Sequence, residues 1–523
     1  MMRFDPNNNP YRVTRKPVYS KNGMVATSQN LAASAGESIL RSGGNAVDAA
    51  IAIAACLTVT EPTSNGIGSD AFAIVRFENE LYGINASGYA PRKINIDSVM
   101  NAGFDKMPRY GMIPVTVPGT PYAWAELSSR FGALSLSDCL KPAIEYALEG
   151  FPVSPVVSEN WERAFRNYKA QAKSDVFIPW FQTFAPNDKT PKPGEIFRLP
   201  HHAETLRDIG LTGAKSFYNG DLANEISKFF TDYDGFLDKD DLSGFTPEWV
   251  EPISINYRGY DIHEIPPNGQ GIVALIALRL MQAYEFESRD ASGTFHKQFE
   301  AIKLAFSAGK QYVTDPRYME ITPEQLLSDD FIGKMRMRIG EFASDPDLPA
   351  PNSGGTVYLA TADKHGNMVS YIQSNYNGFG SGIVIPGTGI AMQNRGADFS
   401  LDPNHINKLE SGKKTYHTII PGFITKNNEA IGPFGVMNSI DFMLNPQAAI
   451  DAPRWQWISG KTFEVERGFD EKAISELSVM GHKIHVKDEV SGFGRGQIIW
   501  RNPIDGVLTG GSDARADSAI ASY

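Results

Sequence analysis

The stretch that most constrains the fold lies about two-thirds along the chain, where two glycines lead into a threonine. Gly354 and Gly355 precede Thr356, which opens a run of strand-forming residues that ends at Asp363. A polar, glycine-containing turn follows at 364–367, and a second strand-like run covers 368–374. Both faces of the first run are largely apolar, which is typical of a strand buried on both sides. The stretch therefore predicts a hairpin at the centre of a covered sheet.

The hairpin places Thr356 beside polar side chains if its loop has four residues. Such a loop pairs Asp363 with Met368, and counting back along both strands sets Thr356 opposite Asn375. The neighbourhood predicted for the threonine on the second strand is then Ser374, Asn375 and Tyr376.

A threonine in this setting can be an N-terminal nucleophile. Cleavage of the backbone before Thr356 would free an α-amino group with a pKa of about 8, which can act as general base for the threonine's own hydroxyl. The alternative is that Thr356 is an ordinary β-forming residue after a glycine pair. The spacing alone leaves both interpretations open.

The segment TVYLATADKHGNMVSYIQSNYNGFGSGIV resembles the catalytic segment of the γ-glutamyltranspeptidase family, in particular its cephalosporin-acylase-like branch. The similarity extends from GMVATSQNLAASAGESILRSGGNAVDAAIA to GGSDARADSAIASY. It implies an α+β fold of the N-terminal nucleophile hydrolase type, a four-layer αββα sandwich with two stacked β-sheets between helical layers. It also implies a precursor that cuts itself between Gly355 and Thr356, so that segments 1–355 and 356–523 form one intertwined unit.

The same resemblance implies an amidase or acyltransferase in which Thr356 cleaves γ-glutamyl (glutathione-type) or glutaryl-type amides through an acyl-enzyme. Ser374 matches the residue whose hydroxyl contacts the nucleophile. The family's paired oxyanion glycines are missing, because Met437 runs directly into Asn438. Either amides at Gly435 or Val436 substitute for them or the protein is only feebly active, since the loss of one oxyanion donor lowers the rate by about 10²–10³.

Substrate specificity is expected to depend on Arg395 and Asp398. Asp398 matches the aspartate that holds a substrate ammonium, whereas Arg395 replaces a residue that accepts hydrogen bonds from the same group. A guanidinium repels an ammonium and holds a carboxylate in a bidentate fork. This favours acyl groups without an α-amino group, such as glutaryl. An Arg395–Asp398 ion pair that only shapes the pocket is the alternative.

Other substrate-binding positions implied by the resemblance are Asn375, Tyr376, His417 and Thr418. We expect His417 to donate or accept a hydrogen bond rather than to act as general base, because the amine of Thr356 fills that role. Ser87 occupies the place of the family's carboxylate-binding arginine and is expected to be structural. Gly68-Ser69-Asp70 stands where the family has Gly-Gly-Asp, and a tight turn or a role in the site are both open.

The amino-acid composition argues against several classes of binding partner. The chain has 49 basic and 60 acidic residues, a net charge of −11, which argues against nucleic acid or an anionic membrane as a partner. Cys56 and Cys139 are the only cysteines, and neither they nor the histidines show metal-site spacing, so no cofactor or metal is expected. No run is apolar enough to be a signal peptide or a membrane span, and the expected location is cytoplasmic.

The expected assembly is a heterodimer of the two cleavage fragments, with further self-association possible. The competing hypothesis is an unprocessed, weakly active or inactive relative that binds small anionic ligands. Locally, the pattern predicts a helix over 31–40, a second helix capped by Asn45 with Asp48 three residues on, and an apolar helix over 272–281.

Overall fold

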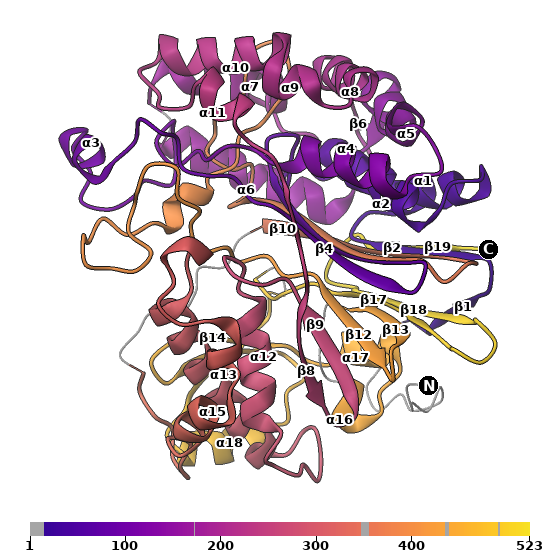
Figure 1. Cartoon of the computed structure of the whole chain (residues 1–523), viewed down its shortest axis with the longest axis vertical. Helices are drawn as coiled ribbons and strands as arrows, with labels where there is room; N and C mark the ends of the chain where they lie inside the picture. Colours follow the sequence, from indigo (N-terminus) through magenta and orange to yellow (C-terminus); the bar gives the residue numbers. More distant parts are fainter. Residues whose placement is uncertain (1–14, 172, 347–354, 435–438, 490–491) are drawn as a thin grey trace.

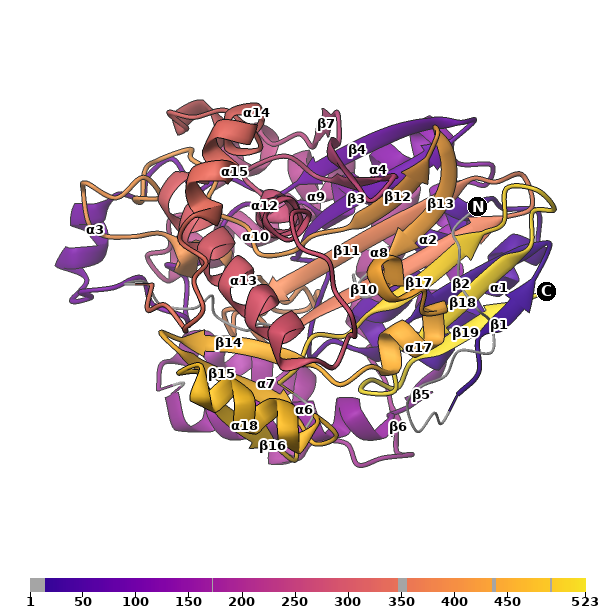
Figure 2. The same cartoon turned by 90° about the horizontal axis from the view of Figure 1, so that it is seen from below.

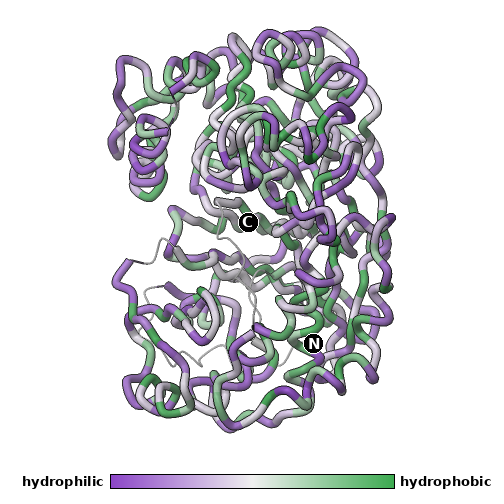
Figure 3. The backbone as a smooth tube through the Cα atoms, turned by 90° about the vertical axis from the view of Figure 1, so that its left-hand side faces the viewer, coloured by the Kyte–Doolittle hydropathy of each residue, from purple (hydrophilic) through white to green (hydrophobic). Residues whose placement is uncertain are grey.

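The computed structural model describes residues 15–171, 173–346, 355–434, 439–489 and 492–523. Two seven-stranded antiparallel sheets face each other, and helices cover both outer faces (Figure 1). The predicted four-layer αββα sandwich is confirmed. Hydrophobic segments run through the middle of the molecule, and hydrophilic segments are frequent along its outline (Figure 3).

The first sheet carries the predicted hairpin at its centre. Its strands, in spatial order, are β19 (Ala519–Ser522), β2 (Gly23–Thr27), β10 (Gly355–Asp363), β11 (Met368–Tyr376), β3 (Asp70–Phe77), β4 (Glu80–Ala86) and β7 (Glu248–Val250). Every residue of β11 is buried, and β10 is buried from Val357 onward. The apolar character of both faces is explained by cover on both sides.

The second sheet stacks on the first. Its order is β1 (Val18–Ser20), β18 (Leu508–Ser512), β17 (Gln497–Arg501), β13 (Glu429–Phe434), β12 (Gly422–Lys426), β9 (Tyr260–Glu264) and β8 (Ile253–Tyr257). The core between the sheets combines side chains from both, among them Phe72, Tyr358 and Ile372 from the first and Phe423 and Ile499 from the second. Side chains of opposing sheets thus fill one continuous layer.

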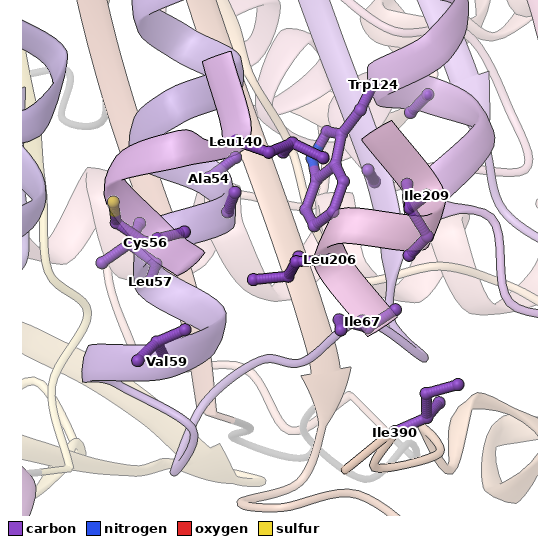
Figure 4. Packing of buried hydrophobic residues seen from close by; sticks show 14 of the residues in the cluster. Ala54, Cys56, Leu57, Val59, Ile67, Trp124, Leu140, Leu206, Ile209 and Ile390 are labelled. Atoms are coloured by element: carbon purple, nitrogen blue, oxygen red, sulfur yellow. The ribbon is translucent and has the colours of Figure 1, made fainter. Parts of the chain in front are cut away.

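Helix α2 (Ala46–Thr60) lies against β10 and β11, and all of its residues are buried. Small residues such as Ala54 let it approach the sheet, and helices α4 and α5 pack over it, with Trp124 and Leu140 in the same cluster (Figure 4). This helical layer contains α1 (Asn30–Arg41), α4 (Thr120–Phe131), α5 (Leu136–Glu149), α6 (Pro155–Gln171), α7 (Ile178–Phe184), α8 (Pro200–Thr212), α9 (Lys215–Asn219), α10 (Asp221–Asp232) and α11 (Lys239–Ser243).

The opposite helical layer, which contains α12 and α13, lies over the second sheet (Figure 2). Its helices are α12 (Gly271–Met281), α13 (Ser292–Tyr312), α14 (Pro323–Leu326), α15 (Asp329–Arg336), α16 (Ser439–Phe442), α17 (Pro446–Asp451) and α18 (Glu471–Val479). Helices α13 and α18 pack with a small sheet of β14 (Trp455–Ser459), β15 (Thr462–Glu466) and β16 (Lys483–Lys487). Helix α3 (Ile96–Asn101) lies outside these groups, and β5 (Phe151–Pro152) and β6 (Ile196–Phe197) form a separate two-stranded sheet.

Several local predictions are confirmed. The helix expected over 31–40 is α1, and the apolar helix over 272–281 is α12. Asn45 caps α2 in a complete capping box, in which Asp48 accepts a hydrogen bond from the amide of Asn45. Cys56 is buried within α2, as expected of a core residue.

The predicted register of the hairpin is wrong by one residue. The loop has three residues rather than four, because the amide of Asp363 donates to the carbonyl of Asn367 at 3.0 Å. The short loop forms because a turn from Asp363 ends at Gly366, whose φ of +87° a glycine adopts readily. Met368 consequently pairs with Ala362, whereas an irregularity between Gly355 and Val357 shifts the pairing back by one residue at the start of β10, where Gly355 faces Tyr376 as the predicted register requires.

Candidate functional site

Thr356 lies at that irregularity, the second residue of β10, and its hydroxyl meets the predicted serine. Thr356 Oγ1 is 3.0 Å from Ser374 Oγ, so the predicted proximity is confirmed. Ser374 Oγ donates to the carbonyl oxygen of Gly355 at 2.9 Å and accepts the amide of Tyr376 at 2.8 Å. Because the single hydroxyl proton of Ser374 goes to Gly355, Thr356 is the donor in the contact between the two hydroxyls.

Tyr376, whose amide donates to Ser374, has an unusual backbone conformation. Its φ is +75°, which is uncommon for a bulky side chain and costs of order 1–3 kcal/mol. Its phenol donates to Asp398 Oδ1 at 2.7 Å. Tyr376 therefore links the serine beside the nucleophile to the aspartate predicted to bind substrate.

A cavity of about 580 Å³ opens onto Thr356. Thr356, Gly355 and Thr418 line it, together with Tyr358 and Ile372 from the hairpin. Two arginines, Arg163 and Arg495, also lie on its wall, and no acidic side chain among the described residues does. A positively charged wall beside the hydroxyl suits an anionic substrate.

Arg395 is buried directly behind this wall. Its Nη1 donates to Thr418 Oγ1 at 2.9 Å and lies 3.3 Å from Asp398 Oδ2, and its guanidinium stacks 4.0 Å from the ring centre of Tyr376. The alternative interpretation, an ion pair that shapes the pocket, is thus observed. Nε and Nη2 have no partner among the described residues. Arg395 does not itself line the cavity, and a direct role in carboxylate binding stays a prediction.

His417 also lies behind the wall, paired with an aspartate. Its Nε2 is 3.0 Å from Asp70 Oδ2, and its Nδ1 lies 3.5 Å from the amide of Ile419, which donates to it. Nε2 is therefore the nitrogen that carries the proton. Burial, together with the charges of Arg395 and Lys414, holds the pKa of His417 well below its usual value. A hydrogen bond to Asp70 is what this geometry assigns to His417.

Asp70 is the site residue that the sequence left undecided. It pairs with Ser374 across β3 and β11, which brings its carboxylate next to the catalytic candidates. Burial raises the pKa of Asp70 to about 7, and Arg395 opposes the shift. The signal that could have found it is the Gly-Ser-Asp sequence before a buried strand.

Asn375 and Ser87 belong to buried networks. Asn375 Oδ1 accepts from Ser69 Oγ at 2.7 Å, while its Nδ2 has no partner among the described residues. Ser87 donates to Asn85 Oδ1 at 2.7 Å and does not line the cavity, which agrees with a structural role. The predicted oxyanion residue Gly435, with Val436, lies outside the described residues.

One set of side chains in the described part of the chain has the geometry to hold a metal ion: His296, Glu300 and His482. The ammonium of Lys303 lies 2.6 Å from Glu300 Oε1 and already balances the carboxylate. We find no described helix with the length and apolar character that a membrane crossing requires.

Comparison with known proteins identifies the family. The gamma-glutamyltranspeptidase family model matches residues 32–523. The glutathione hydrolase-like YwrD proenzyme of Bacillus subtilis is 34% identical over 96% of this chain and 99% of its own length. The oxamate amidohydrolase proenzyme of Klebsiella pneumoniae is 31% identical over 96% of this chain and 99% of its own.

Among solved structures, the cephalosporin acylase of Bacillus halodurans superposes with a TM-score of 0.95 at 55% identity, covering 99% of both chains. That agreement extends over both sheets and both helical layers. The match of the family model over nearly the whole sequence, together with the threonine–serine pair at the start of β10, shows that the chain is a member of the γ-glutamyltranspeptidase family.

Proposed function

We propose that the protein is a self-processing amidase. Thr356 first cleaves the peptide bond that precedes it and then acts as the nucleophile toward substrates. The observation that carries the proposal is the contact of three oxygens: Thr356 Oγ1, Ser374 Oγ and the carbonyl oxygen of Gly355. A hydroxyl and a polarised carbonyl at the same peptide bond are the two parts that self-cleavage needs. The alternative of an unprocessed binding protein is not favoured, because the relatives are proenzymes of hydrolases.

The processing step follows from these contacts. Thr356 Oγ attacks the carbonyl carbon of Gly355, while the Ser374 hydroxyl donates to the oxygen on which charge develops. The C–N bond breaks, the nitrogen of Thr356 takes the proton, and an ester joins Gly355 to the threonine oxygen. Water then hydrolyses the ester, which leaves a carboxylate on Gly355 and a free amine and hydroxyl on Thr356.

The freed residue then repeats the chemistry on substrates. The α-amine of Thr356 accepts the hydroxyl proton as the oxygen attacks the substrate amide, and passes it to the departing amine. Water or an acceptor amine resolves the acyl-enzyme. The hydroxyl of Ser374, 3.0 Å from Thr356 Oγ1, orients the nucleophile.

For the substrate we propose an amide whose acyl half ends in a carboxylate, with glutaryl preferred over γ-glutamyl. The carboxylate of Asp398 already contacts the Tyr376 phenol and Arg395, so a substrate ammonium would have to compete for it. Arg395 lies close by, its Nε and Nη2 have no partner among the described residues, and its charge opposes an additional positive charge. Glutathione-type γ-glutamyl amides would then be the weaker class.

The first test is mass spectrometry of the purified protein. We expect two fragments that meet at Gly355 and Thr356, and a single uncut chain in Thr356→Ala. The second test compares release of 4-nitroaniline from glutaryl and γ-glutamyl 4-nitroanilides. An intact native chain that still hydrolyses an anilide would contradict the mechanism, and a preference for the γ-glutamyl compound would contradict the substrate assignment.

A further inference from the structure

Asp70 faces the space between the two sheets, in line with the serine beside the nucleophile. It pairs with Ser374 across β3 and β11, and directly paired residues of neighbouring strands share one face of a sheet. Phe72 and Ile372, two positions away on each strand, pack in the core between the sheets, so the paired residues face it as well. Asp70 is fully buried and does not line the cavity, so any effect on a substrate passes through a neighbour.

That neighbour is His417, and both oxygens of the Asp70 carboxylate accept hydrogen bonds. Oδ2 accepts from Nε2 of His417 at 3.0 Å, and Oδ1 accepts from the amide of Gly88 at 3.3 Å. Two N–H groups thus converge on one side chain, which suits an ionised carboxylate because it has an acceptor oxygen for each. The imidazole proton is thereby held on Nε2, which leaves Nδ1 as an acceptor.

The acceptor nitrogen of His417 contacts the cavity wall. Nδ1 accepts from the amide of Ile419 at 3.5 Å. Three consecutive residues of this segment line the cavity that opens onto the nucleophile: Thr418, Ile419 and Ile420. The imidazole is therefore the link between a buried carboxylate and a wall of the cavity.

The other support of this wall segment ends one residue earlier. The amide of His417 donates to the carbonyl of Asn268 at 2.9 Å, and its carbonyl accepts from the amide of Gln270 at 2.8 Å. Gln270 Nε2 also donates to the carbonyl of Thr418 at 2.5 Å. The amide of Ile419 lies beyond these contacts, and its partner is the imidazole.

We propose that Asp70 is a positioning residue for cleavage of the substrate amide, because it fixes the proton and the orientation of the His417 imidazole, which in turn holds the wall segment 418–420 in place. This inference rests on the proposed function, because the wall belongs to the same cavity. A displacement of about 1 Å in a group that positions a substrate can cost about 10²-fold in rate.

Asp70→Asn keeps the shape of the side chain but leaves one acceptor oxygen for two N–H groups. If this oxygen faces Nε2 of His417, the amide of Gly88 meets an NH₂ group. If it faces Gly88 instead, the NH₂ group requires a bare Nε2, and the proton that moves to Nδ1 opposes the amide of Ile419. Either arrangement breaks the set of contacts that leads from position 70 to the wall.

The kinetic test is a double-mutant cycle with glutaryl-4-nitroanilide at pH 8, above the pKa of about 7 of Asp70. We expect Asp70→Asn to lower kcat/KM of the processed protein at least tenfold, and His417→Gln to lower it as well. In the His417→Gln background, Asp70→Asn should cost less than threefold, because an amide at 417 can turn either its oxygen or its NH₂ group toward residue 70. The same loss in both backgrounds, or native kcat/KM in His417→Gln, would overturn the inference.

Asp48→Asn is the matched control, since Asp48 is an equally buried carboxylate away from the cavity wall. It accepts the amides of Asn45 and Ala133 in the helical layer, and its replacement should change kcat/KM less than threefold. A loss as large as that of Asp70→Asn would show that the effect is not specific to position 70, and would overturn the inference.

The rate of processing separates the wall from the serine. Fragment formation in Asp70→Asn should proceed at close to the native rate, because Ser374 keeps its hydrogen bonds to Thr356 and Gly355. Processing slowed as much as substrate cleavage would assign the effect of Asp70 to Ser374 rather than to the wall, and would contradict the proposal.

A spectroscopic measurement tests the contact without turnover. In protein with isotopically labelled histidine, the Nε2 proton of His417 should give a downfield NMR signal, because a hydrogen bond to a carboxylate is charge-assisted. His417→Gln identifies this signal by its loss. Asp70→Asn should move it upfield or remove it, and an unchanged signal would overturn the proposal. Should the anilide not be cleaved at all, the proposed function fails, and the signal still shows whether Asp70 fixes the imidazole.

Discussion

The Ser374 hydroxyl donates a hydrogen bond to the carbonyl oxygen of Gly355, the oxygen of the peptide bond that self-processing would break. Replacing Ser374 by alanine removes the donor that stabilises charge on this oxygen. The loss of one such donor lowers a rate by about 10²–10³. We expect Ser374→Ala to slow fragment formation by that order, followed as a time course by gel electrophoresis and mass spectrometry.

Ser370 is the matched control, since it lies on the same strand and is buried. Its hydroxyl contacts the Tyr358 phenol at 2.8 Å, not Thr356 or Gly355. Ser370→Ala should therefore process at close to the native rate. Equal slowing of both variants would indicate that the strand, rather than the Ser374 hydroxyl, is what processing requires.

Arg395→Met tests the buried ion pair and the charge preference together. The change removes both contacts of Nη1, to Asp398 and Thr418, and leaves a buried carboxylate with the Tyr376 phenol. Breaking one side of a buried pair costs about 3–5 kcal/mol in the free energy of unfolding. Without the cation, γ-glutamyl anilides should gain at least tenfold in kcat/KM relative to glutaryl anilides.

The double variant Arg395→Met/Asp398→Asn separates the two effects. Removing both charges should recover part of the lost stability in urea unfolding, because no uncompensated carboxylate is left. It should not recover the binding of an ammonium. If Arg395→Met changed neither stability nor the preference between anilides, the guanidinium would have no role in either.

Lys303 and Glu300 form a fully buried ion pair on α13, 2.6 Å apart. Lys303 Nζ also donates to the carbonyl of Ser344 at 2.6 Å, and Glu300 accepts from the hydroxyl of Ser344. The pair therefore anchors the part of the chain that leads to the predicted cleavage point. Burial lowers the pKa of Lys303, and Glu300 opposes the shift.

We expect Lys303→Met to cost about 3–5 kcal/mol in the free energy of unfolding, because Glu300 is left charged and unpaired. Lys303→Met/Glu300→Gln should cost less than the single change. Urea unfolding in a Thr356→Ala background, which keeps the chain uncut, provides the measurement. A single variant as stable as the parent would show that the lysine is dispensable.

The central hairpin could be predicted from the sequence because its signals are local. Apolar residues on both faces of 357–362 predict burial on both sides, and a short turn forces Thr356 near Ser374. The one-residue error in register has a local cause as well. The carboxylate of Asp363 accepts the amides of His365 and Asn367, which closes a three-residue loop that composition alone does not distinguish from a four-residue one.

The remainder of the site depends on contacts between distant parts of the chain. His417 meets Asp70 across 347 positions, and Arg495 shares the cavity with Arg163 of α6. No spacing rule links such residues, since the two sheets and their helices must be assembled before the side chains converge. The resemblance to a family predicted site roles for His417 and Asp398, but it predicted none for Arg163 or Arg495, the two arginines of the cavity wall.

Glu264, the last residue of β9, gives a prediction about pH. It is 2% exposed, its Oε2 has no partner among the described residues, and burial holds its pKa well above the usual value. A raised pKa means that the folded protein binds a proton that the unfolded chain has already released. The contribution of Glu264 to stability is therefore complete below about pH 4.5 and is lost as pH rises toward its pKa in the folded state, by up to about 1.4 kcal/mol per pH unit.

Glu264→Gln removes this titration, so the gain in stability over the native residue should grow between pH 5 and pH 7, by up to about 1.4 kcal/mol per pH unit. Urea unfolding of both proteins at the two pH values, in the Thr356→Ala background, measures the difference and cancels the titration of all other groups. The exposed Glu251 is the control, and Glu251→Gln should change little at either pH. A gain for Glu264→Gln that is the same at both values would show that Glu264 is ionised in the folded protein throughout this range, and that its burial is offset by a group near it.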